Sequence, residues 1–238
     1  MTITHERTSE VLACFYRVER AGAARLSDGG GPFGFDIHTA LLVEDLISSY
    51  HPAAVVETGC HLGDTTKYLA MAYPDLPVFT CDIDPDATRF TAHRLRNERH
   101  VTVACCNSPD LVAEVDARHS PGLYFLDAHW GEHWPLRQEL ESITSGIAVV
   151  HDFDIGHPRF SFDEYGGVRC GPELLAQVPH LADLFFTPDP EISYPLPCLQ
   201  VGRRAGVGVV PIGVDPSPMY ENPHLTSHSL QTVRKGAS

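Results

Sequence analysis

The sequence predicts an α/β fold: a Rossmann-like, doubly wound and mostly parallel seven-stranded sheet, with helices on both faces and an N-terminal helical flank. From Ala53 onward, short apolar runs alternate with amphipathic segments, which is typical of a parallel sheet covered on both faces. The first apolar run, 53–58, passes through a glycine-bearing turn directly into a helical segment. That order of strand, turn and helix is the repeating unit of such a fold.

Residues 1–52 are predicted to form the flank. Apolar residues recur at helical spacing over 9–21, and Asp36 is suited to cap a second helix that ends before Pro52. The glycine-rich stretch 28–34 separates these two helices. Its composition fits a simple connector, which we favour, or a lid over a ligand.

Seven apolar runs are predicted to form the strands of the main domain, 53–214. They cover residues 53–58, 77–81, 101–106, 122–126, 147–150, 184–187 and 207–210. The first five all end in polar residues. Because ligands bind beyond the carboxyl ends of strands in an open parallel sheet, these residues are predicted to meet in one cleft. Residues 215–238 have little periodicity and are predicted to be a tail or arm, in which His224 and His228 are solvated.

Composition narrows the classes of partner. A net charge of −14 disfavours nucleic acid and anionic membranes, which need a basic face, and favours a small-molecule substrate. Seven cysteines, an odd number without Cys-x-x-Cys spacing, indicate reduced thiols. Together with an N-terminus unlike a signal peptide, they predict a cytoplasmic protein. The flank and the tail lie outside the core sheet and could serve a homodimer contact.

The turn after the first strand is predicted to hold a nucleotide-type ligand. Glycines at Gly59 and Gly63 allow a ligand to approach backbone N–H groups left unpaired at a helix N-terminus. Their spacing matches neither the dinucleotide fingerprint nor a P-loop, which disfavours a nicotinamide-dependent enzyme. Asp82 ends the second strand, where a carboxylate can accept both hydroxyls of a ribose. Asn107 and Ser108 follow the third strand.

Glu57-x-Gly59-x-x-x-Gly63-x-Thr65-Thr66, followed by Asp82 and Asn107, resembles the motifs of class I S-adenosylmethionine-dependent methyltransferases. The resemblance runs from about residue 36 to 154. It implies that 53–214 is a Rossmann-like methyltransferase domain with S-adenosylmethionine as its cofactor. The cofactor-binding residues that it implies are Glu57, Thr58, Gly59, His61, Gly63, Thr65, Thr66, Asp82, Ile83, Asn107, Ser108 and Asp127.

Asp127 and Asp152 end the fourth and fifth strands, so two carboxylates are predicted to project into the cleft. Such pairs commonly hold a divalent cation. They resemble the metal-binding pairs of cation-dependent small-molecule O-methyltransferases, the macrocin and sugar O-methyltransferase-like branch. This chain departs from that branch at His129 and His151, where acids are usual. The predicted metal ligands are Asp127, His151 and Asp152, for magnesium, manganese or another transition metal.

The resemblance implies transfer of a methyl group to an oxygen of a small polar metabolite, assisted by a metal. We predict His129 as the general base and Asp127 as its catalytic partner. Trp130 and Trp134 flank the same loop, and we expect at least one of them to line the pocket. Two alternatives stay open: a metal-independent N- or C-methyltransferase, and a non-catalytic protein that binds S-adenosylmethionine.

Overall fold

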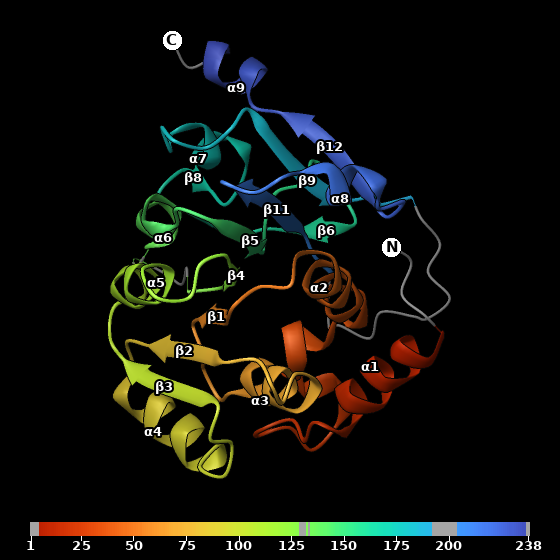
Figure 1. Cartoon of the computed structure of the whole chain (residues 1–238), viewed down its shortest axis with the longest axis vertical. Helices are drawn as coiled ribbons and strands as arrows, with labels where there is room; N and C mark the ends of the chain where they lie inside the picture. The colour runs from red at the N-terminus through yellow and green to blue at the C-terminus, as the bar shows by residue number, and fades with distance from the viewer. Residues whose placement is uncertain (1–4, 129–131, 133, 192–203, 237–238) are drawn as a thin grey trace.

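A computed structural model describes residues 5–128, 132, 134–191 and 204–236. Its centre is an eight-stranded sheet in the order β12-β9-β11-β5-β4-β1-β2-β3 (Figure 1). The five parallel strands are β1 (Val55–Thr58), β2 (Val78–Asp82), β3 (Val101–Cys105), β4 (Gly122–Leu126) and β5 (Gly146–His151). Beyond β5 the strands pair antiparallel: β11 (Val207–Ile212), β9 (Leu184–Pro188) and β12 (Leu225–Ser229). The mostly parallel α/β fold predicted from the sequence is confirmed.

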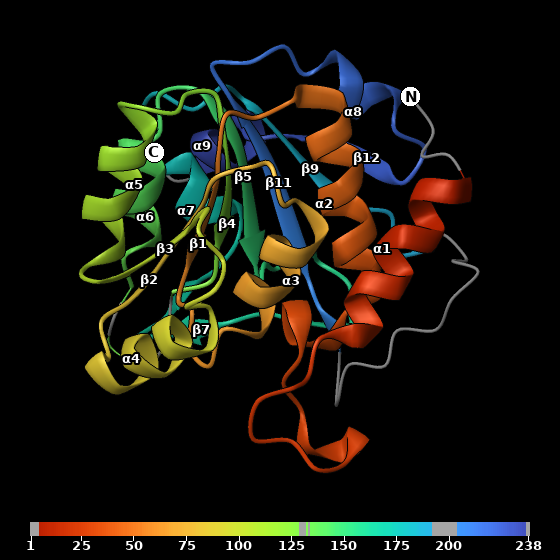
Figure 2. The same ribbon diagram turned by 60° about the horizontal axis from the view of Figure 1, so that its bottom comes forward.

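Helices cover both faces of the sheet, as Figure 2 shows from a second direction. One face packs against α5 (Ser108–Asp116), α6 (Leu136–Ser142) and α7 (Pro172–Ala176). The other packs against α1 (His5–Arg17), α2 (Ile37–Tyr50), α3 (Asp64–Ala72) and α8 (Ser217–Glu221). Two helices lie outside these clusters: α4 (Pro85–Arg94), which contacts β2 and β3, and α9 (Gln231–Gly236), which contacts α7.

Successive side chains along a strand point to opposite faces of the sheet. In β1, Val56 points to the cluster with α5 and α6, while Val55 points to the cluster with α2 and α3. Every residue of β4 and of β5 is buried, which explains why both read as unbroken apolar runs in the sequence. Helices α1 and α2 of the flank share the second cluster, in which α1 packs against α2 and α3.

The C-terminal segment departs from the sequence prediction. Leu225–Ser229 forms an eighth strand, β12, that pairs with β9 at the edge of the sheet, so the predicted count of seven is wrong. His228 is half-buried, stacks on Phe185 and contacts the hydroxyl of Thr187, and is therefore not a solvated tail residue. The sequence does not show an apolar run here, because an edge strand with one face in water carries polar residues.

Short elements fill the irregular region after β5. Two small sheets form here: β6 (Phe160–Ser161) with β10 (Arg204–Ala205), and β7 (Glu164–Tyr165) with β8 (Val168–Arg169). Two short 3-10 helices, η1 (Leu26–Asp28) and η2 (Pro32–Phe35), lie in the glycine-rich stretch before α2. Among the described residues, none of the helices combines the length and apolar character needed to cross a bilayer. The six described cysteines are free thiols.

Candidate functional site

A cleft of about 700 Å³ opens at the carboxyl ends of β1, β2, β4 and β5. This volume falls within the range of roughly 300–1,000 Å³ that is usual for small-molecule sites. Most of the residues predicted for the site line it: Glu57, Gly59, His61, Thr65, Asp82, Ile83, Ser108, Asp127, His151 and Asp152. The predicted convergence of strand ends on one cleft is thus what the structure shows.

Four predicted residues do not line the cleft: Thr58, Gly63, Thr66 and Asn107. Thr58 and Thr66 are buried beneath it, where they hold Asp127 and Glu57. Gly63 has a left-handed backbone (φ 73°), and a Cβ there would lie 2.7 Å from the side chain of Thr91. These residues shape the site from below.

The turn between β1 and α3 is tied to β2. The N–H groups of Gly59 and Cys60 donate to the carbonyl of Cys81, at 3.0 and 2.9 Å, and that of His61 donates to Asp82 Oδ2 at 2.9 Å. The expectation of unpaired N–H groups is therefore wrong for these three residues, because the neighbouring strand already supplies their acceptors. Both His61 (φ 44°) and Gly59 (φ 79°) adopt the left-handed conformation that lets the turn fold this tightly.

Gly59 joins the ends of β1 and β4. A Cβ at this position would lie 2.5 Å from the carbonyl oxygen of Asp127. Only glycine allows the turn to pass this close to the residue that ends β4. The requirement for Gly59 therefore comes from packing within the chain as well as from any ligand.

Glu57 is fully buried, and its Oε2 accepts hydrogen bonds from the hydroxyls of Thr66 and of Thr80, the latter at 2.7 Å. Burial raises the pKa of Glu57 to about 8, although the two hydroxyls lower it. Glu57 is therefore mainly protonated at neutral pH and contributes little negative charge to the cleft. Burial likewise raises the pKa of Glu139 in α6 to about 7, near the hydroxyls of Ser108 and Thr58.

Asp82 is held in place by two main-chain donors. Its Oδ2 accepts from His61 N and its Oδ1 accepts from Asp84 N, at 2.9 and 3.0 Å. Each carboxylate oxygen keeps a further lone pair for a ligand. Next to it, the apolar side chain of Ile83 is 54% exposed. Asp84 caps α4 by accepting from Asp86 N at 2.8 Å. A carboxylate with free lone pairs beside an apolar surface suits a nucleoside.

After β3, Ser108 lines the cleft but Asn107 does not. Asn107 Oδ1 is buried and has no hydrogen-bond partner in the part of the chain that the structure describes. A buried amide oxygen of this kind costs free energy unless a donor satisfies it. The end of β3 therefore retains a polar group that is free to accept a hydrogen bond.

Asp127, His151 and Asp152 form a compact cluster at the ends of β4 and β5. His151 Nδ1 lies 3.1 Å from Asp127 Oδ1 and 3.2 Å from Asp152 Oδ2, and one potential ligand atom from each residue lies within 4.8 Å of the others. Asp152 has a left-handed backbone (φ 48°), which is costly outside glycine and typical of functional sites. One nitrogen and two carboxylates suit manganese, iron or zinc, with open positions left for a substrate.

Charge balances within this cluster. Burial alone would lower the pKa of His151, but Asp127 and Asp152 outweigh it, so that the pKa of His151 lies well above its ordinary value. The imidazolium then holds the two carboxylates together, and a bound cation would replace its proton. His151 Nε2 is buried and finds no hydrogen-bond partner among the described residues.

The loop after β4 is described only in part. His129, predicted as the general base, and Trp130 lie outside the described residues. Trp134 is half-buried against the hydrophobic cluster of α5 and α6 and does not line the cleft.

Several lining residues were not predicted from the sequence. They include Gly30, Gly31 and Gly34 of the flank, Asp64 at the start of α3, and Asp163 before β7. The glycine-rich stretch is therefore more than a connector. Besides Glu57, which is mainly protonated, six carboxylic residues line the cleft: Asp64, Asp82, Asp84, Asp127, Asp152 and Asp163. No described lining residue is lysine or arginine. Such a lining suits a cationic ligand and opposes a pyrophosphate.

Searches among known proteins give a result at the level of structure. No protein-family model matches the chain, and no curated sequence matches it significantly. The Podospora anserina methyltransferase PaMTH1, solved with S-adenosylhomocysteine, superposes with a TM-score of 0.50 and 11% identity over 88% of each chain. This chain has the class I methyltransferase fold.

Two further solved structures have lower TM-scores. The N-methyltransferase NodS from Bradyrhizobium japonicum, with S-adenosylhomocysteine, has a TM-score of 0.49 at 16% identity over 86% of this chain and 99% of its own. A caffeoyl-CoA O-methyltransferase-like protein from Staphylococcus aureus has a TM-score of 0.40 at 16% identity over 60% of this chain; the match spans 65% of its length, just under two thirds. In the class I methyltransferase fold, the cleft described above lies where ligands of open α/β sheets bind.

Proposed function

We propose that the chain is an S-adenosylmethionine-dependent methyltransferase that methylates an oxygen of a small polar metabolite, with a divalent cation held by Asp127, His151 and Asp152. The observation that carries the proposal is the union of two features in one cleft. A nucleoside-type half at the ends of β1, β2 and β3 faces a three-residue candidate metal centre at the ends of β4 and β5.

The residues of the first half fit the cofactor. Asp82 presents carboxylate oxygens to a ribose, Ile83 presents apolar surface to a base, and Asn107 has an unsatisfied oxygen. When bound, S-adenosylmethionine supplies an electrophilic methyl group on a sulfonium, and the acidic lining stabilises that positive charge. The absence of lysine and arginine from the described lining argues against a dinucleotide cofactor in the same cleft.

The residues of the second half fit a cation and an acceptor. Asp127, His151 and Asp152 would hold the metal, which when bound lowers the pKa of an acceptor hydroxyl. We propose His129 as the group that removes the hydroxyl proton, with Asp127, two residues before it in the sequence, as its catalytic partner. Asp163 lines the cleft near this end and would orient hydroxyl or amine groups of the acceptor.

Calorimetric titration with S-adenosylmethionine, before and after exhaustive chelation, tests this proposal. We expect micromolar binding that survives chelation, and separate binding of Mn²⁺ to the chelated protein. Failure to bind S-adenosylmethionine would refute the cofactor assignment. Failure to bind Mn²⁺ or Mg²⁺, with cofactor binding intact, would instead favour a metal-independent N-methyltransferase, for which the acidic lining could hold an amine.

We further propose a small-molecule acceptor, with no nucleic acid or membrane as partner, and a cytoplasmic setting for the enzyme. The net charge of −14 supports the exclusion of anionic partners. A homodimer through the flank or the C-terminal segment stays a prediction, which light scattering coupled to size-exclusion chromatography would decide.

A further inference from the structure

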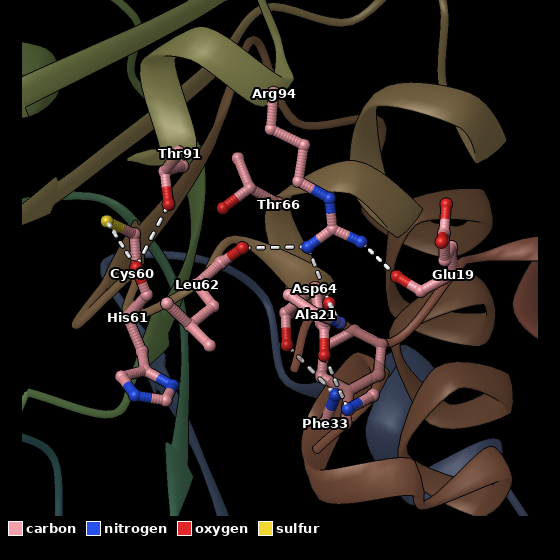
Figure 3. Close-up of polar contacts among 12 residues, drawn as sticks. Glu19, Ala21, Phe33, Cys60, His61, Leu62, Asp64, Thr66, Thr91 and Arg94 are labelled. Atoms are coloured by element: carbon pink, nitrogen blue, oxygen red, sulfur yellow. Dashed lines mark hydrogen bonds and ion pairs between the residues drawn. The ribbon is translucent and has the colours of Figure 1, made fainter. Parts of the chain in front are cut away.

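The glycine-rich wall, residues 29–34, is part of the cleft although it precedes the sheet in the chain. Gly30, Gly31 and Gly34 all line the cleft. The wall includes most of η2 and leads into α2, and among the described residues it pairs with no strand that could fix its position. It is held by the burial of Phe33 against Tyr68 and Phe125 and by a hydrogen bond from Arg20 to the carbonyl of Gly29. It is also held by a set of polar contacts centred on Asp64 and Arg94, which Figure 3 shows in close-up.

Asp64 is the first residue of α3 and its side chain is only 11% exposed. Its Oδ2 accepts from Gly31 N at 2.7 Å, and its Oδ1 accepts from Ala21 N at 3.0 Å. The carboxylate therefore bonds the flank at both ends of the loop that contains the wall. Beside it, Thr65 Oγ1 accepts from Phe33 N at 2.9 Å, so the first turn of α3 supplies all three contacts.

Arg94 comes from the last turn of α4 and holds Asp64 in turn. One guanidinium nitrogen donates to Asp64 Oδ1 at 2.5 Å and to the carbonyl of Leu62 at 2.7 Å, and the other donates to the carbonyl of Glu19. Figure 3 shows the side chain reaching between the turn after β1 and the flank. Charge-assisted bonds from one planar group to three acceptors are strong and directional.

The backbone is strained at Phe33 within the wall and at Phe35 directly after it, so the surroundings impose its conformation. Phe33 (φ 53°) and Phe35 (φ 69°) are bulky residues in the left-handed region. Such conformations cost about 1–3 kcal/mol each and persist only where the surroundings impose them. Gly31 cannot be replaced by a larger residue, since a Cβ would lie 2.7 Å from the ring of Phe35. Loss of the polar contacts would therefore let the wall relax away from the cleft.

We propose that Asp64 and Arg94 are positioning residues that hold the glycine-rich wall against the cofactor, so that cofactor affinity depends on a side chain, Arg94, that does not line the cleft. The inference rests on the function proposed above. It predicts that loss of Arg94 weakens cofactor binding, whereas charge attraction alone predicts the opposite. Removing the positive charge of Arg94 makes the cleft more negative, which by charge alone strengthens binding of the cationic cofactor.

Calorimetric titration with S-adenosylmethionine of wild type, Arg94→Gln, Arg94→Lys and Arg89→Gln tests the inference. Arg89 is the matched control, because it lies on the same helix in an ion pair that is 77% exposed on each side. We expect Arg94→Gln to weaken binding about tenfold or more, Arg94→Lys to recover part of that loss, and Arg89→Gln to leave affinity within about twofold. Unchanged or tighter binding by Arg94→Gln would overturn the inference.

Trypsin cleavage after the exposed Arg25 gives a second readout that needs no ligand. We expect faster cleavage in Arg94→Gln than in Arg89→Gln at temperatures well below the melting temperature of both, and equal rates would overturn the inference. If wild type binds no S-adenosylmethionine, the proposed function fails, while the cleavage rates still decide whether Arg94 holds the wall.

Discussion

In the half of the cleft formed by β1, β2 and β3, main-chain N–H groups meet carbonyl and carboxylate oxygens of the neighbouring strand. The half formed by β4 and β5 depends instead on three charged side chains, of which His151 carries the balancing charge. The first half is thus fixed by the fold itself and the second by particular residues. Substitutions should therefore have separable effects: cofactor binding should follow the first half and metal binding the second.

Gly59 is the point where the two halves of the cleft touch, so Gly59→Ala should disturb both halves at once. The left-handed backbone, and the 2.5 Å that would separate the new Cβ from the carbonyl oxygen of Asp127, predict a loss of about 3 kcal/mol in the free energy of unfolding, measured by urea denaturation. Gly167→Ala is the control, because Gly167 has a similar φ (81°) but no atom within 4 Å of its Cβ position. Equal losses in both variants would show that the contact with Asp127 is unimportant.

Asp152→Asn should affect the second half alone. Loss of one carboxylate of the cluster should weaken Mn²⁺ binding by about 100-fold, measured by electron paramagnetic resonance, and leave S-adenosylmethionine affinity nearly unchanged. Asp163→Asn also removes a carboxylate from the cleft lining, but outside the cluster, and should have little effect on the metal. If the two variants bind Mn²⁺ equally, the cluster is not a metal centre.

Asp82→Asn should affect the first half alone. An amide accepts fewer hydrogen bonds than a carboxylate and cannot serve both His61 N and a ribose equally, so we expect about tenfold weaker S-adenosylhomocysteine binding by calorimetry. Metal affinity should not change. Asp86→Asn, which alters an exposed acid on the adjacent helix, provides the baseline. Tight binding by Asp82→Asn would remove Asp82 from the cofactor site.

Glu57→Gln should have the smallest effect and should appear only as a change in pH dependence. Burial raises the folded pKa of Glu57 to about 8, above the usual value of 4.5, so the folded state binds the extra proton. Wild-type stability should therefore fall as pH rises from about 5 to about 8, and the glutamine variant should lack this part of the decline. Thermal unfolding at pH 6 and pH 9 would measure it, with the exposed Glu114→Gln for comparison. Parallel curves for wild type and Glu57→Gln would contradict the assignment.

The sequence was informative where structure is local. Strand, turn and helix follow one another around Gly59, and the polar ends of β2, β4 and β5 are adjacent to their strands, so these positions could be predicted. Asp64 was visible only as the residue that opens a helix. Its contacts with Ala21 and Gly31 cross the chain from flank to domain, and no local pattern encodes them.

The same reason explains the other omissions. Asp163 reaches the cleft because its N–H donates to the carbonyl of Asp152 at 3.0 Å, in a region without periodicity. The protonated state of Glu57 depends on complete burial under Thr66 and Thr80, which follows from packing and not from its position in the motif. Sequence identified the residue types that the site needs, whereas tertiary contacts decided their charge and environment.

Strand β12 keeps β9 from being the edge strand of the sheet. It covers one side of β9, whose Phe185 and Phe186 make it a short apolar strand, and it presents Thr226, Ser227 and Ser229 to water. A chain shortened before Leu225 would leave the N–H and C=O groups of β9 unpaired beside those rings. Such edges recruit strands from other molecules, so truncation should cause aggregation through intermolecular β-sheets.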